Sequence, residues 1–242
     1  MNALKNNERG LSLVEVTIML LVLMLLTSVL APSIADFIND AKWVKVKEDC
    51  EAIGLSTMRL TRDVGPCLKF HANQPCTMYN RADLLYSDGP APDSLTVSGG
   101  ALYNSNVYGG MLNWDTSSRS DTMQNQFVTN DTPAYPTPTA NQTSQAGLQF
   151  GLGWRGAYLS GPIGPDPWGH AYVMNSVFLA TATDAGCTSG CEGTTTGGWS
   201  YDAFCLSAGP NGLYESPISG NNNGGHVRAG DDFSYVISGG TR

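Results

Sequence analysis

The sequence predicts an α+β protein in which one long N-terminal helix packs against a small antiparallel β-sheet with long loops. The first observation behind this prediction is an apolar run, residues 11–31, that passes without a stop signal into apolar residues spaced by three and four. The second is that β-type segments separated by Gly and Pro begin only near residue 148. With 242 residues, the chain has room for a membrane helix and one globular domain of ordinary size.

The apolar run is long enough to cross a membrane, which takes about 20 apolar residues. A short polar leader, residues 1–10, precedes it and carries Lys5 and Arg9. Positive charge ahead of a membrane helix favours a cytoplasmic N-terminus. We therefore expect residues 11–31 to span the membrane once and the rest of the chain to lie outside the cytoplasm.

One charged residue, Glu15, interrupts the apolar run. A carboxylate in hydrocarbon costs at least ~2.5 kcal/mol, so it is expected to have a partner. If the chain is cut after Gly10, the new amino terminus at Leu11 lies about one helical turn away from Glu15. The terminal amine of a neighbouring copy would then neutralise this carboxylate, and the membrane helices would pack side by side.

A secretory signal peptide and a plain signal anchor are the alternatives for this stretch. The signal peptide is disfavoured because the charge lies inside the apolar run and no small-x-small cleavage site follows directly. A plain anchor gives no reason for the carboxylate.

Beyond Pro32, which should kink the helix without ending it, the pattern becomes amphipathic. The helix is predicted to end near Gly65 and Pro66. We therefore expect one helix over residues 11–65, with its second half offering an apolar stripe to a small domain. The residues of this stripe are Trp43, Val46, Cys50, Ile53, Thr57, Leu60 and Val64.

The remainder of the chain divides into two parts. Residues 66–147 are rich in Gly, Asn, Ser, Thr, Asp and Pro and are predicted to be a variable, loop-rich insertion. Residues 148–242 are predicted to form the sheet, with strands in 169–179, 199–206 and 233–237. The apolar face of such a sheet needs the amphipathic helix as its cover.

Six cysteines all follow the membrane segment. An even count in an oxidising compartment indicates up to three disulfides, with the pairing left open. The pairs nearest in sequence, Cys67–Cys76 and Cys187–Cys191, would each close a small loop. The alternative for the second pair is half a zinc site, which lacks its other ligands. The disulfide candidates are Cys50, Cys67, Cys76, Cys187, Cys191 and Cys205.

Charge and motif content exclude several classes of function. The net charge is −8, and no lysine follows Lys69, so no basic stripe is available to bind nucleic acid. The three histidines are far apart, and the signatures of zinc peptidases, serine hydrolases and P-loop ATPases are absent. We therefore expect a protein that is not an enzyme, and any ATPase in its pathway would be a separate chain.

A rigid turn is predicted in WRGAYLSGPIGPDPWGHAY, residues 154–172. Pro165 and Pro167 fix the backbone, and Gly169 permits an unusual dihedral angle. Trp168 would then lie over the core at the start of the following strand. We interpret this motif as architecture and not as a site of chemistry.

A possible calcium loop is formed by LSAGPNG, residues 206–212, together with GDDFSYVI, residues 230–237. Calcium takes about six or more oxygen ligands. Asn211, Asp231 and Asp232 supply side-chain oxygens near the two ends of one loop, and a cation would relieve the repulsion between the adjacent carboxylates. The alternative is a polar turn with a solvated pair of aspartates.

The N-terminal stretch resembles the prepilin signal of type IV pilins and of type II secretion pseudopilins. The match consists of Gly10 before the cut, Leu11 as the first mature residue, Glu15 as the fifth and Pro32 as the twenty-second. Family members usually begin the mature chain with Phe, so Leu11 is a departure. The resemblance implies cleavage after Gly10 by a prepilin peptidase, with methylation of the new terminus as the family's next step.

The C-terminal part resembles the major pseudopilin of type II secretion. In its calcium loop, the family's ligand positions fall on the backbone carbonyl of Ala208, the side chain of Asn211, and Asp231 and Asp232. The chain has Asn211 where the family has Asp, and its excursion over residues 213–228 is longer. The segment before the first strand matches at Tyr158, Leu159, Asp166, Pro167, Trp168, Gly169 and Tyr172.

The resemblance implies a pilin fold and a structural subunit that polymerises through its N-terminal helix into a helical filament. Its partners would be copies of itself, the prepilin peptidase, an inner-membrane assembly platform and a separate ATPase. The chain would lie in the bacterial inner membrane with a periplasmic C-terminal domain before joining a periplasmic or extracellular filament that serves protein transport. The alternatives are the major pilin of a surface type IV pilus and, in a different class, a membrane-anchored binding module or enzyme.

Overall fold

The structure is a computed structural model that describes residues 12–72, 74, 80–97, 120–132, 135–137, 153–179, 202–218 and 227–238. The leader, the cleavage residues Gly10 and Leu11, and Cys76, Cys187 and Cys191 lie outside the described residues. The chain divides into two compact units, Met1–Val44 and Lys45–Arg242.

One helix, α1, runs over Leu13–Val64 and contains Pro32. The helix begins after Ser12, and it ends where Gly65 adopts a φ of 95°, a conformation that glycine reaches without strain. The N–H of Gly65 donates to the carbonyl of Thr61 at 2.8 Å, which satisfies one of the last carbonyls of the helix. The predicted continuation through Pro32 and the predicted end near Gly65 are confirmed.

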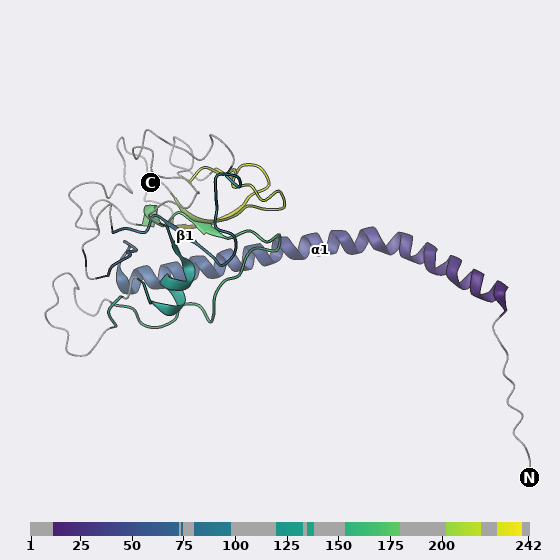
Figure 1. Cartoon of the computed structure of the whole chain (residues 1–242), viewed down its shortest axis with the longest axis horizontal. Coiled ribbons are helices and arrows are strands. Elements are labelled where there is room, and N and C mark those ends of the chain that lie inside the picture. The colour runs from purple at the N-terminus through teal and green to yellow at the C-terminus, as the bar shows by residue number, and fades with distance from the viewer. Residues whose placement is uncertain are drawn as a thin grey trace, which may run out of the picture. The chain divides into compact units, whose positions relative to one another are not determined.

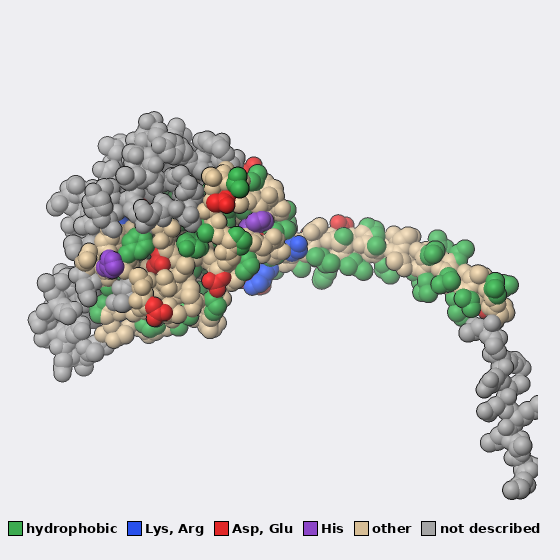
Figure 2. All heavy atoms as spheres, in the orientation of Figure 1, with side chains coloured by type: hydrophobic (Ala, Val, Ile, Leu, Met, Phe, Trp, Pro, Cys, Tyr) green, Lys and Arg blue, Asp and Glu red, His purple; other side chains and the backbone are tan. Residues whose placement is uncertain are grey.

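In the first unit, most of α1 is exposed, and its residues 13–34 are mostly apolar. Its large hydrophobic side chains from Leu13 to Ile38 are between 42% and 79% exposed, and Figure 2 shows them along the N-terminal part of the helix. Among the described residues this is one helix that is long and apolar enough to cross a membrane. A signal sequence near the N-terminus would meet the same criteria of length and composition.

The second unit contains a five-stranded sheet with the order β2-β1-β3-β4-β5. Strand β1 pairs with β2 in parallel, and the other neighbouring pairs are antiparallel. The strands are β1 Leu84–Tyr86, β2 Ser120–Thr122, β3 Val173–Met174, β4 Ala203–Ser207 and β5 Phe233–Ser238.

The three strands predicted from the sequence correspond to β3, β4 and β5 and pair antiparallel, as expected. The sheet as a whole is mixed, because β1 and β2 add a parallel pair that the prediction of an antiparallel sheet did not include. A parallel pair needs a connection of about a dozen residues or more, and the chain between β1 and β2 supplies it. Both strands come from residues 66–147, where three-residue strands are too short to give a periodic pattern. This segment also adds a π-helix, Asn125–Thr129. The predicted strand at 169–179 is shorter than expected: it consists of β3, which is followed by a 3-10 helix, Ser176–Leu179.

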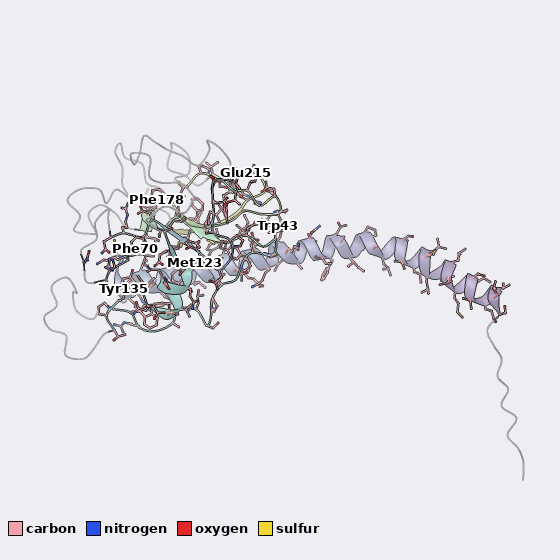
Figure 3. All side chains as sticks on the ribbon, viewed as in Figure 1. Trp43, Phe70, Met123, Tyr135, Phe178 and Glu215 are labelled. Carbon is pink, nitrogen blue, oxygen red and sulfur yellow. The ribbon has the colours of Figure 1, made fainter. Side chains whose placement is uncertain are left out.

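The main core lies between the C-terminal part of α1 and one face of the sheet (Figure 1). The middle of the predicted helical stripe is fully buried, from Val46 to Leu60. Gly54 allows the closest approach, since a Cβ there would lie 3.0 Å from the Tyr235 ring. Residues of the 66–147 segment complete this core, among them Phe70, Met123 and Tyr135 (Figure 3).

A second core covers the opposite face of the sheet. In β4, Cys205 belongs to the core beneath α1, whereas Phe204 and Leu206 belong to the second core together with Tyr214 and Ile218. Strand β4 is therefore buried on both faces. The loop that follows β4 is held against the sheet by these contacts.

Candidate functional site

The acidic residue of the apolar helix has a partner within its own chain. The N–H of Ser12 donates to Glu15 Oε2 at 2.9 Å, and the N–H of Glu15 donates to Ser12 Oγ at 3.4 Å. This reciprocal pair is a capping box, which satisfies two of the first donors of a helix. The Ser12-x-x-Glu15 spacing is the sequence signature of this cap, beside the membrane charge that Glu15 carries. The cap occupies one of the two carboxylate oxygens.

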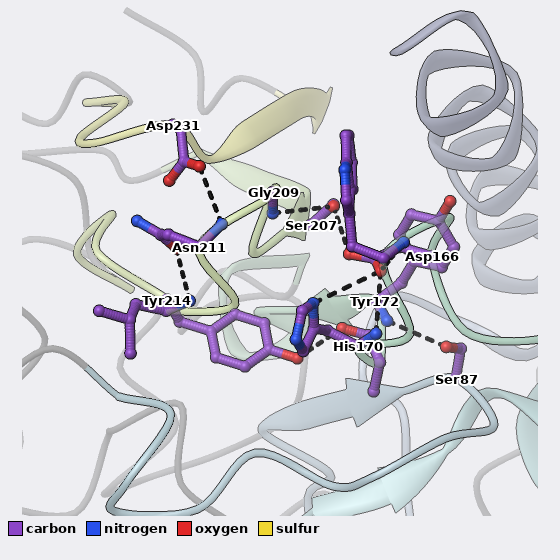
Figure 4. Close-up of polar contacts among 12 residues, drawn as sticks. Ser87, Asp166, His170, Tyr172, Ser207, Gly209, Asn211, Tyr214 and Asp231 are labelled. Atoms are coloured by element: carbon purple, nitrogen blue, oxygen red, sulfur yellow. Dashed lines mark hydrogen bonds and ion pairs between the residues drawn. The ribbon is translucent and has the colours of Figure 1, made fainter. Parts of the chain in front are cut away.

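The turn predicted around Trp168 is built on the carboxylate of Asp166, which is 3% exposed. Its Oδ1 accepts the N–H groups of Trp168 at 3.0 Å and His170 at 2.9 Å (Figure 4). Gly169 adopts a φ of 98° and donates its N–H to the Asp166 carbonyl at 2.9 Å. Trp168 packs against the main core, as predicted.

The same carboxylate joins this turn to β4, far away in sequence. Ser207 Oγ donates to Asp166 Oδ2 at 2.7 Å and accepts the N–H of Gly209 at 3.3 Å (Figure 4). A second tie is the hydroxyl of Tyr214, which donates to the carbonyl of Ala171 at 2.6 Å. The turn around Trp168 and the loop after β4, which carry separate sequence motifs, are therefore parts of one hydrogen-bonded cluster.

The cluster contains Ser, His and Asp side chains, but they are not arranged as in a serine hydrolase. In a serine hydrolase the serine donates to a histidine, which in turn is oriented by the acid. In this cluster Ser207 donates directly to Asp166, and His170 Nδ1 lies 3.6 Å from the same carboxylate. The arrangement holds the turn and the loop after β4 in place.

The two ends of the predicted calcium loop meet in the structure. The N–H of Asn211 donates to Asp231 Oδ2 at 3.0 Å, across 20 residues of sequence. The carboxylate of Asp232 is fully buried, and its Oδ2 accepts the N–H groups of Glu215 at 2.9 Å and Ser216 at 2.6 Å. Ala208 is also fully buried, at the end of β4.

Glu215 is an acidic member of this loop that the sequence reasoning missed. Its Oε2 accepts from Asn211 Nδ2 at 2.9 Å. Its carboxylate occupies the space where a Cβ on residue 230 would lie, and Gly230 has a φ of 59°. A glycine is therefore required at this position for both space and conformation.

Two carboxylate oxygens in the loop are suited to a cation. Asp231 Oδ1 and Asp232 Oδ1 are buried and have no hydrogen-bond partner among the described residues. Burial also raises the pKa of Asp232 to about 6, because a buried carboxylate is costly when charged. A bound cation would relieve both effects. In the described part of the chain, however, no three His, Cys, Asp or Glu side chains come together as a metal site, so backbone and amide oxygens would have to complete the set.

Three of the six cysteines lie within the described residues. Cys67 is disulfide-bonded. Cys50 and Cys205 are buried free thiols whose Sγ atoms are 2.6 Å apart. The predicted pairs Cys67–Cys76 and Cys187–Cys191 include residues outside the described ranges, so both pairings stay predictions.

No protein-family model matches the chain, and no curated protein or solved structure matches it. The resemblance to pilins and pseudopilins therefore depends on the residues and motifs described above.

Proposed function

We propose that the chain is a structural subunit of a helical, pilus-like filament and polymerises through the N-terminal part of α1. The observation that carries this proposal is an exposed apolar helix with a single acid, Glu15, in its first turn. The subunit would be the major pseudopilin of a type II secretion-like system. It would be cleaved between Gly10 and Leu11 by a prepilin peptidase.

The exposed apolar surface of α1 supports the proposal, because lipid would cover it before assembly and other copies of the helix would cover it afterwards. Burial of apolar surface is favourable by roughly 25 cal/mol per Å², so these side chains would not remain in water. Lipid would cover them in the inner membrane, where the chain would span once with its globular unit in the periplasm. Neighbouring copies of α1 would cover them in the filament, after extraction by an assembly platform and a separate ATPase.

Glu15 supports an ordered polymer more than a plain anchor. A carboxylate unpaired in hydrocarbon costs at least ~2.5 kcal/mol. Pairing with the Leu11 amine of the adjacent copy would remove this cost only on assembly. The equilibrium constant for adding each subunit would then rise by about 70-fold. The capping bond from Ser12 uses Oε2, and a carboxylate accepts through two oxygens.

The calcium loop supports the pseudopilin among filament subunits. The loop would hold the cation through the carbonyl of Ala208, the side chain of Asn211, and Asp231 and Asp232. The unpartnered oxygens of the two aspartates agree with this role. Calcium would supply a positive charge that fixes the loop after β4 to the start of β5.

The experiment that tests the proposal separates the two possible roles of Glu15. Glu15→Gln keeps an oxygen that can serve in the capping box but removes the charge, whereas Glu15→Val removes both. Ser12→Ala is the matched control, because it weakens the cap and leaves the charge. Each variant is expressed with its peptidase and assembly machinery, and leader cleavage and sheared filaments are both measured.

The proposal expects Glu15→Gln and Glu15→Val to be cleaved normally and to lose filaments alike, while Ser12→Ala still assembles. Wild-type filament yield from Glu15→Gln, with loss only in Glu15→Val, would mean that Glu15 acts as a cap and not as an ion pair. A wild-type chain that is cleaved but stays monomeric in the membrane would favour a membrane-anchored binding module.

A further inference from the structure

Two buried cysteines from distant parts of the chain meet in the main core. Cys50 lies in α1 and Cys205 in the middle of β4, 155 residues apart in sequence. Both residues are 0% exposed. Their Sγ atoms are 2.6 Å apart, which leaves no room for any atom between the two sulfurs. A disulfide bond, at about 2.05 Å, needs only a small further approach.

A third cysteine indicates the redox environment in which this core forms. Cys67 is disulfide-bonded in the structure, and its partner is neither Cys50 nor Cys205, since both of these are free thiols. Structural disulfides persist in oxidising compartments and are rare in the cytosol. An oxidant that closes the Cys67 disulfide would also be able to form a second one.

We propose that Cys50 and Cys205 form a disulfide bond that joins α1 covalently to β4. This bond would cross the main core at the centre of the interface between the helix and the sheet. Any force applied to the helix would then reach the sheet through a covalent bond as well as through packing. The inference uses the proposed location of the globular unit outside the cytoplasm, but it does not require filament assembly.

The chemistry is an ordinary two-step thiol–disulfide exchange with a disulfide-bearing oxidoreductase as the oxidant. One cysteine thiolate attacks the oxidant's disulfide, which forms a mixed disulfide and releases one oxidant thiolate. The second cysteine thiolate attacks the mixed disulfide, which forms the Cys50–Cys205 bond and releases the other thiolate. The chain loses two protons and two electrons, and the oxidant's disulfide is reduced to a dithiol.

Burial places this reaction before the core closes. In the folded core no oxidant reaches the fully buried sulfur atoms. Burial also raises the pKa of the Cys50 thiol well above its ordinary value, so the thiolate needed for attack is scarce there. The bond therefore forms while α1 is still separate from the sheet, and once closed it resists reductants until the chain unfolds.

The direct test is peptide mapping of the full chain. Acid first stops thiol–disulfide exchange in the membranes, and free thiols are then blocked with N-ethylmaleimide at neutral pH in denaturant. Cleavage at Lys, Arg and Asp releases Cys50 in residues 49–59 and Cys205 in residues 202–228, each peptide holding one cysteine. The proposal expects these two peptides as one linked species that separates on reduction. Recovery of both as blocked free thiols, or linkage of either one to another cysteine, would overturn it.

Cys67→Ala provides the matched control. It removes a different disulfide, so the linked species should persist in this variant. A chain that fails to form filaments but still yields the linked species would contradict the proposed function and leave the disulfide in place.

A second readout is thermal stability. Closing a loop of this length should raise the melting temperature by about 10 °C. Reduction during unfolding should therefore lower the melting temperature of Cys67→Ala by about that amount. It should leave a Cys50→Ala/Cys67→Ala/Cys205→Ala variant unchanged, and an equal response in the two variants would count against the bond.

Discussion

The strongest prediction from the globular unit concerns Asp166, whose carboxylate joins the turn before β3 to the end of β4. Asp166→Ala removes the acceptor of three hydrogen bonds, from the N–H groups of Trp168 and His170 and from the hydroxyl of Ser207. Hydrogen bonds to charged groups contribute about 1.5–3 kcal/mol each, and buried donors left without partners cost about 1–3 kcal/mol each. These costs are not additive, and we expect a loss of about 3–5 kcal/mol in the free energy of unfolding.

Asp166→Asn provides a graded comparison. The amide oxygen still accepts the two backbone N–H groups, while the amide nitrogen cannot accept from Ser207. This variant should lose only about 1–2 kcal/mol. A double-mutant cycle of Asp166→Asn with Ser207→Ala should give a coupling free energy of about 1–2 kcal/mol for the pair.

The assay is urea unfolding of the full chain in detergent micelles, followed by tryptophan fluorescence. The expected order of stability is wild type, then Asp166→Asn, then Asp166→Ala. A loss below about 1 kcal/mol for Asp166→Ala would show that the three bonds to this buried carboxylate do not hold the turn.

Three further predictions concern the calcium loop and the helix face. Calcium at a hundredfold excess over Kd should raise the melting temperature of the wild type by about 5–10 °C. The double variant Asp231→Ala with Asp232→Ala should abolish this rise. If the double variant lowers the melting temperature equally in calcium and in chelator, calcium has no part in the stability of the loop. In metal-free protein, the pKa of Asp232 is about 6 in the folded state against an ordinary 3.8, so the folded state binds the proton more tightly. The contribution of Asp232 to stability should therefore increase by about 2 kcal/mol as the pH falls from 7 to 4, and Asp232→Asn should remove this dependence. Bound calcium should reverse the sign, because protons compete with it for the same oxygens. Leu60→Ala should cost about 2–5 kcal/mol because Leu60 is 0% exposed, whereas Leu55→Ala, at a position 54% exposed on the same helix, should be nearly neutral in the isolated subunit.

The helix could be predicted from the sequence because its signals are local. A repeat of three and four residues fixes which face is buried, and the stripe from Val46 to Leu60 is buried as expected. Gly65 ends the helix because glycine adopts a positive φ without strain. The capping box is an equally local signal, because Ser12 and Glu15 stand three residues apart.

The sheet was harder to predict because its determinants are pairings between distant segments. Strand β2 is Ser120–Thr122, a polar segment with no strand-like alternation, and only its pairing with β1 makes it a strand. The bond from Ser207 to Asp166 spans 41 residues and follows from no short motif. The contact between Cys50 and Cys205 is likewise visible only after the helix and sheet have packed.

The most direct single measurement is a helical reconstruction by electron cryo-microscopy of sheared filaments that contain this chain. Polymerisation through α1 predicts a bundle of packed α1 helices, no density for residues 1–10, and the amine of Leu11 within ion-pair distance of Glu15 from an adjacent copy. Subunits that retain the leader, or filaments in which neighbouring α1 helices make no contact, would contradict it.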